Sequence, residues 1–103
     1  MTKNVLLTCG AGASSGFMAA AARKATKKLG IDLNFTAKSE SEVEDLLPEV
    51  DVLLVAPHLK YMLADIQEIA EKNNVICDAI PQRIYGMLDG KALVTFVEKE
   101  LGK

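Results

Sequence analysis

The stretch Val5-Leu6-Leu7-Thr8-Cys9-Gly10-Ala11-Gly12-Ala13-Ser14-Ser15-Gly16 joins an apolar run to a helical run through small residues. The apolar run predicts a strand over about residues 4–8, and the residues from Gly16 to Leu29 predict a helix that ends at Gly30. Small residues between a strand and a helix let backbone N–H groups converge on a tetrahedral anion, and the helix N-terminus adds partial positive charge. Residues 10–16 therefore predict a phosphate-binding segment, and Cys9 directly precedes it.

Such an environment lowers the pKa of a thiol toward that of a reactive thiolate. We therefore interpret Cys9 as a nucleophile. The predicted phosphate-binding residues are Gly10, Ala11, Gly12, Ala13, Ser14, Ser15 and Gly16. The second cysteine, Cys77, lies in a strand-like apolar run and is interpreted as part of the core. The single histidine, His58, could accept phosphate or orient a partner's histidine, but we favour a surface position for it.

Composition limits the class of protein. The 103 residues are 50% hydrophobic and 25% charged, which predicts one domain over residues 1–103. A net charge of −2 lacks the basic excess of a nucleic-acid binder, and no apolar stretch is long enough to span a bilayer. The N-terminal residues resemble no signal peptide, so we expect a cytoplasmic protein with both thiols reduced. Two cysteines and one histidine suggest no metal site, and no cofactor is expected.

Strand-like and helix-like segments alternate along the rest of the chain, which predicts an α/β fold with a parallel sheet. Further strands are expected over about residues 31–37, 51–56 and 75–79, and helices over about 60–72 and from Gly90 to Leu101. Ser39 and Glu42 predict a capping box for a short helix that ends at Leu47 before Pro48. Right-handed crossovers favour the strand order 2-1-3-4, with helices flanking the sheet. A ligand should then bind between strands one and three, beside the Cys9 and Pro57-His58 loops.

Three motifs carry a resemblance to a known family. They are Cys9 to Gly16, Ala56-Pro57-His58-Leu59-Lys60-Tyr61-Met62-Leu63, and Tyr85-Gly86-Met87-Leu88-Asp89-Gly90. In this order, the motifs resemble the enzyme IIB component of the bacterial sugar phosphotransferase system (PTS), lactose/cellobiose (chitobiose) type. The resemblance covers nearly the whole chain. It implies the doubly wound fold of the low-molecular-weight tyrosine phosphatases, although some relatives have serine where this chain has Gly16.

The resemblance also implies an activity, that of a phosphotransferase. Cys9 would accept a phosphoryl group from a phosphohistidine of enzyme IIA. It would then pass the group to a sugar of the lactose, cellobiose or chitobiose class bound to membrane enzyme IIC. Loop N–H groups and the hydroxyls of Ser14 and Ser15 would stabilise the phosphoryl oxygens. We expect a monomer with a docking rim around Phe17, His58 and Tyr61, because transient partners favour modest interfaces.

Two alternatives stay open at this point. The first is a hydrolase like the low-molecular-weight phosphatases, whose Cys-x5-Arg motif is incomplete here because Ser15 occupies the arginine position. Those enzymes also use the aspartate of an Asp-Pro pair as a general acid, and this chain has no such pair. The second alternative is a doubly wound binding domain without covalent chemistry. In that case replacement of Cys9 would have no effect.

Overall fold

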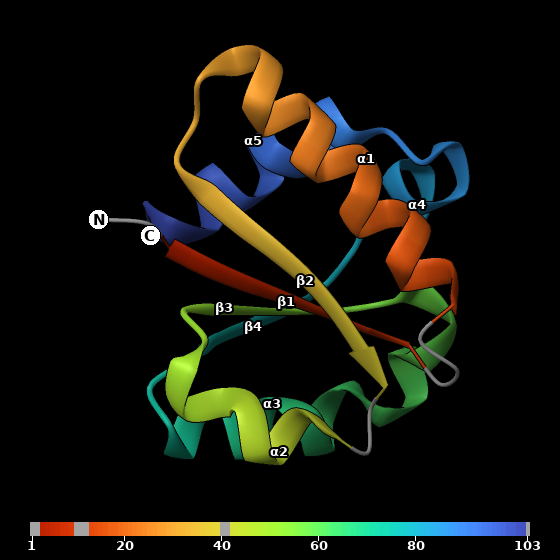
Figure 1. Ribbon diagram of the computed structural model, residues 1–103. Helices are drawn as coiled ribbons and strands as arrows, with labels where there is room; N and C mark the ends of the chain where they lie inside the picture. The colour runs from red at the N-terminus through yellow and green to blue at the C-terminus, as the bar shows by residue number, and fades with distance from the viewer. Residues whose placement is uncertain (1–2, 10–12, 40–41, 103) are drawn as a thin grey trace.

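The computed structural model describes residues 3–9, 13–39 and 42–102 (Figure 1). Strands and helices alternate along these residues. The strands are β1 (Lys3–Cys9), β2 (Leu33–Ser39), β3 (Val52–Val55) and β4 (Ile76–Ala79). The helices are α1 (Ala13–Leu29), α2 (Val43–Leu46), α3 (Leu63–Lys72), α4 (Gln82–Met87) and α5 (Gly90–Leu101), with 3-10 turns η2 (Leu47–Glu49) and η3 (Pro57–Met62).

The four strands form one parallel sheet in the order β2-β1-β3-β4, as the sequence predicts. Val5 of β1 lies opposite Phe35 of β2 and Val52 of β3, so β1 is paired on both sides. The chain winds toward β2 first and toward β3 and β4 afterwards. This reversal places the topological switch point between β1 and β3.

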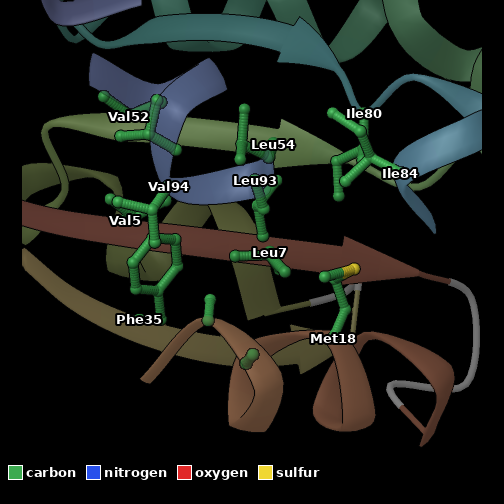
Figure 2. Close-up of a cluster of buried hydrophobic side chains, with 13 residues drawn as sticks. Val5, Leu7, Met18, Phe35, Val52, Leu54, Ile80, Ile84, Leu93 and Val94 are labelled. Carbon is green, nitrogen blue, oxygen red and sulfur yellow. The ribbon is translucent and has the colours of Figure 1, made fainter. Parts of the chain in front are cut away.

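Helices cover both faces of the sheet: α1, α4 and α5 lie on one side, and α2 and α3 lie on the other (Figure 1). Successive strand residues point to opposite faces, so each central strand contributes to two cores. On the α1 side, Val5, Leu7 and Leu54 pack against Met18 and Leu93 (Figure 2). On the α3 side, Leu6, Leu53 and Val55 pack against Val43 and Ile66, among others. Each fully buried aliphatic side chain stabilises the fold by about 1.5–3 kcal/mol.

Gly90 allows α5 to pack closely on α1. A Cβ atom at this position would overlap the carbonyl group of Ala21 and lie within 3 Å of the backbone nitrogen of Ala22. Only a residue without a side chain permits this approach. Because α1 begins shortly after Cys9, the contact at Gly90 helps to fix the helix that follows the cysteine.

The start of α1 and the start of β2 differ from the predicted positions. Helix α1 begins at Ala13, three residues before the predicted start at Gly16. Its end matches the prediction: Gly30 adopts φ +69°, and the N–H of Ile31 donates to the Thr26 carbonyl at 3.0 Å. This capping arrangement uses Ile31, so β2 begins at Leu33 and continues to Ser39.

The structure shows one of the two contacts of the predicted capping box, and residues 40 and 41, between Ser39 and Glu42, lie outside the described residues. Ser39 is the last residue of β2, and α2 begins at Val43 with Glu42 as its N-cap. One half of the expected pattern is present, because the N–H of Ser39 donates to Oε2 of Glu42 at 3.4 Å. The sequence spacing therefore identified a contact that is present, while the described α-helical residues of α2 begin at Val43.

Two further elements were not predicted. The 3-10 turn η3 occupies residues up to Met62, so α3 begins at Leu63 instead of Lys60. Helix α4 lies in a segment that reads as loop, because it follows Pro81 and contains Gly86. It ends at Met87, and its C-cap Leu88 adopts a left-handed conformation with φ 50°.

Candidate functional site

Cys9 and the turn after β3 lie next to each other at the switch point. Cys9 ends β1, and Thr8 pairs with Val55, the last residue of β3. The N–H of Ala56 donates to the Thr8 carbonyl at 3.0 Å, which holds the start of the Pro57 turn against β1. The structure thus brings together the two loops that the strand order predicts. Open sheets of this kind bind ligands at this position.

The predicted phosphate-binding segment falls partly outside the described residues. Gly10, Ala11 and Gly12 are not described. Ala13, Ser14, Ser15 and Gly16 belong to the first turn of α1, so the prediction that they form a loop is wrong. Small residues and serine are well tolerated in a first helical turn, which explains the earlier start.

A first helical turn is itself suited to an anion. The backbone N–H groups there have no partner within the helix, and they form the positive end of its dipole. The 17-residue helix α1 has no acidic side chain in its first turn that would compete for them. Within the described residues, no heavy atom beyond the chain neighbours and the backbone of α1 lies within 4 Å of a Cβ atom built at Gly16, so this position has room for a side chain.

Thr8 places a polar group beside Cys9. Its side chain is fully buried, and its Oγ1 atom has no hydrogen-bond partner within the described ranges 3–9, 13–39 and 42–102. A buried hydroxyl without a partner costs about 1–3 kcal/mol. Sequence reasoning did not single out Thr8, because a threonine at the end of a strand is ordinary.

Exposed apolar side chains surround this edge of the sheet. Phe17, in α1, is 68% exposed, and Tyr61, after β3, is 81% exposed. Both belong to the predicted docking rim. Met87, which is 77% exposed, and Leu88 follow β4 through α4. The predicted docking rim did not include Met87 and Leu88, because the sequence of α4 reads as a loop.

A cavity of about 340 Å³ lies where β3 and β4 end. Its lining includes Pro57, Leu63, Asp78 and Gln82. Oδ1 of Asp78 accepts a hydrogen bond from the N–H of Ala79 at 2.8 Å. Within the described part of the chain, no group of three or more His, Cys, Asp or Glu side chains is placed to hold a metal ion.

Cys77 has a different environment. It lies inside β4, is half-buried, and packs against the α3-side core. Burial raises the pKa of its thiol from 9.0 to about 12, and the negative charge of Asp78 adds to this effect. A thiol with that pKa stays protonated at neutral pH, which agrees with the interpretation of Cys77 as a core residue.

Comparisons with known proteins agree on one family. The family model described as "PTS system, Lactose/Cellobiose specific IIB subunit" matches residues 4–96. The galactose-specific EIIB component of Lactococcus lactis subsp. cremoris is 31% identical over 101 residues, which cover 93% of this chain and 94% of that protein. The lactose-specific EIICB component of Lacticaseibacillus casei is 29% identical over 100 residues, which cover 95% of this chain and 17% of that longer protein.

A solved structure gives the same result for the fold. The lactose-specific IIB domain of the Streptococcus pneumoniae phosphotransferase system superimposes with a TM-score of 0.89 and 17% identity. The match covers 97% of this chain and 98% of that one, so the two share their architecture. None of the helices in the described residues combines the length and the apolar character needed to cross a membrane.

Proposed function

Because this chain belongs to the lactose/cellobiose-specific IIB subunit family of the sugar phosphotransferase system, we propose that Cys9 carries a phosphoryl group between two partner proteins. One observation supports this role above all. Cys9 is the last residue of β1 at the switch point, and only residues 10–12 separate it from the N-terminus of α1. The strand end that carries the thiol and the helix end that suits an anion are therefore close together along the chain.

In the proposed first step, Cys9 accepts the group from a phosphohistidine of enzyme IIA. The thiolate attacks phosphorus in line, an S–P bond forms, and the N–P bond to the imidazole breaks. The imidazole nitrogen keeps the electron pair of that bond. N–H groups of the residue 10–16 segment and the hydroxyls of Ser14 and Ser15 stabilise the three equatorial oxygens during the transfer.

In the proposed second step, a sugar hydroxyl attacks the phosphocysteine. A new O–P bond forms, the S–P bond breaks, and the thiolate of Cys9 is regenerated. The proton of the hydroxyl passes to a base outside this chain. We assign the sugar to the lactose, cellobiose or chitobiose class and place it on membrane enzyme IIC. The lactose-specific EIICB relative supports this partner, since its name joins the C and B components in one polypeptide.

The proposal favours transfer over hydrolysis. Phosphatases of the same fold clamp the phosphate with the arginine of a Cys-x5-Arg motif, and Ser15 occupies that position here. Without the arginine, a phosphocysteine would persist until the sugar arrives. We further propose that residues 1–103 act as a single cytoplasmic domain and as a monomer, because a relay exchanges partners through modest interfaces.

Intact mass spectrometry tests the proposal. The wild type, Cys9→Ser and Cys77→Ser are each incubated with phosphoenolpyruvate, the general carrier proteins and a lactose/cellobiose-type IIA. We expect one added phosphoryl group on the wild type and on Cys77→Ser, and none on Cys9→Ser. Equal labelling of all three proteins would move the acceptor to His58 or another residue. Absence of label from all of them, with several IIA proteins tried, would contradict the relay and favour a hydrolase or a binding domain.

A further inference from the structure

A groove of about 640 Å³ lies between α4 and α5, apart from the Cys9 site. Its apolar floor contains Ile84, which is buried, and Phe96, which is half-buried against the α1-side core. Three exposed basic side chains line it: Arg83, Lys91 and Lys99. We call this surface, together with Met87, the α4–α5 groove. Asp89 also lines it, and its Oδ1 accepts a hydrogen bond from the N–H of Ala92 as the N-cap of α5.

The basic groove belongs to a protein whose charges are separated across the sheet. All charged side chains of α1 are basic: Arg23, Lys24, Lys27 and Lys28. On the opposite side of the sheet, residues 42–51 carry acidic side chains and no basic ones. Helix α5 carries Glu98 and Glu100 as well as Lys91 and Lys99, so the basic character of this side comes from α1 and from the side chains that line the groove. Complementary charge steers association and sets its orientation, so the three basic side chains that line the groove favour an acidic partner there.

The groove begins at the edge of the sheet where the parallel strands end, which is also the edge where β1 ends at Cys9. Helix α4 follows the carboxyl end of β4, where the N–H of Ile80 donates to the Val55 carbonyl at 2.8 Å. Met87 lies at that edge and also lines the groove, which then runs along α5 toward Lys99.

We propose that the α4–α5 groove docks an acidic amphipathic segment of the protein that donates the phosphoryl group to Cys9. Carboxylates of that segment pair with Arg83, Lys91 and Lys99, and an apolar side chain rests on Ile84 and Phe96. The concave shape and the recessed apolar floor suit a protruding peptide segment better than a flat lipid surface. The identity of the partner as the donor rests on the proposed function.

Transfer kinetics test this docking. The groove variant is Arg83→Gln/Lys91→Gln/Lys99→Gln, and the matched control is Lys24→Gln/Lys27→Gln/Lys28→Gln, which removes the same charge from exposed positions of α1. The measurement is the second-order rate constant for transfer from phosphorylated IIA, at low and physiological salt. We expect the groove variant to lose about tenfold and to respond less to salt, and the control to lose less than about twofold. The final extent of phosphorylation should be unchanged in both.

Equal losses in the two variants would indicate a general effect of charge and would overturn the docking site. Absence of any loss in the groove variant would overturn it as well. If the groove variant is slow but reaches full labelling while the control keeps a normal rate, the slow transfer does not come from damage to the chemistry at Cys9. The comparison therefore isolates the position of the charges from their number.

Amide chemical shifts separate this proposal from the function on which it rests. The labelled wild type is titrated with unphosphorylated IIA, and we expect shifts at Arg83 and along Lys91 to Lys99. If Cys9 takes no phosphoryl group but these shifts occur and vanish in the groove variant, the relay fails and the docking site stands. Shifts confined to α2 and α3 would overturn the docking site. The same shifts on concentrating this protein without IIA would assign the groove to a second copy of the chain. Binding of the wild type, but not of the groove variant, to phosphatidylglycerol vesicles would assign it to a lipid surface. Either result would overturn the proposed docking site.

Discussion

The two cysteines of this protein lie in the same sheet but in opposite circumstances. Cys9 ends β1, with the start of α1 after residues 10–12. Cys77 lies inside β4, half-buried against the α3 side, with the carboxyl group of Asp78 next to it. The setting of Cys77 suppresses the thiolate, whereas we propose that the setting of Cys9 favours it. Position relative to a strand end, more than residue type, decides whether a thiol is suited to chemistry or to packing.

Alkylation measures the difference between the cysteines directly. With a pKa of about 12, Cys77 is ionised to roughly one part in 10,000 at pH 8, whereas a thiol at a helix N-terminus ionises at or below its ordinary pKa. Iodoacetamide should therefore modify Cys9 at least about 1,000-fold faster than Cys77. The rates are followed by mass spectrometry on Cys77→Ala and Cys9→Ala, each of which retains one thiol. Alkylation rates of Cys9 and Cys77 within tenfold of each other would contradict the proposed difference in reactivity between the two thiols.

Gly90→Ala should disturb the packing of α5 on α1, the helix that follows Cys9. The added Cβ would overlap the carbonyl group of Ala21, and such overpacking lowers the free energy of unfolding by about 1–3 kcal/mol. Gly86→Ala is the control, since no described heavy atom beyond the chain neighbours and the helix's own backbone lies within 4 Å of its Cβ position, and alanine favours a helix. Urea unfolding gives both free energies. To relieve this overlap α1 must move, and this movement should change the alkylation rate of Cys9 more than that of Cys77. Equal unfolding free energies for Gly90→Ala and Gly86→Ala would contradict the close packing.

The raised pKa of Cys77 also predicts a dependence of stability on alkaline pH. Its thiol holds its proton more tightly in the folded state, so its contribution to stability is complete below the unfolded pKa of about 9.0 and is lost as pH rises toward about 12. Other groups titrate in this range, so the measured quantity is the difference between the wild type and Cys77→Ala in urea at each pH. We expect the wild type to lose stability more steeply above pH 9. Parallel curves would show that Cys77 titrates normally in the folded protein.

The smallest predicted effect concerns Thr8, next to Cys9. Its buried hydroxyl has no partner among the described residues, so Thr8→Val should leave stability unchanged or raise it by up to about 1 kcal/mol. Thr26→Val is the matched comparison, because Oγ1 of Thr26 is buried and donates to the Arg23 carbonyl at 2.8 Å. That variant should lose about 1 kcal/mol in urea unfolding. A similar loss for Thr8→Val would show that its hydroxyl has a partner beyond the described residues.

The strand order and the place of Cys9 could be predicted because their signals are local and strong. Apolar runs such as Val52 to Val55 are typical of buried parallel strands, and Gly30 marks the end of α1. The right-handed crossover rule then brings the carboxyl ends of β1 and β3 together. These features require no knowledge of side-chain contacts.

The missed features depend on tertiary structure or on weak local signals. Helix α4 follows Pro81 and contains Gly86, which disfavours a helix interior, so packing of Ile84 against the core must stabilise it. Without α4, neither the exposed Met87 nor the α4–α5 groove can be anticipated. The early start of α1 was missed because Ala13, Ser14 and Ser15 suit a loop and a first helical turn equally well.

Phosphorus NMR of the wild-type protein tests the central claim most directly. The protein is incubated with phosphoenolpyruvate, the general carrier proteins and a lactose/cellobiose-type IIA, and is then separated from them. We predict a resonance of the S–P type that is present in Cys77→Ala and absent from Cys9→Ala. An N–P resonance that persists in Cys9→Ala would place the phosphoryl group on His58 and contradict the account.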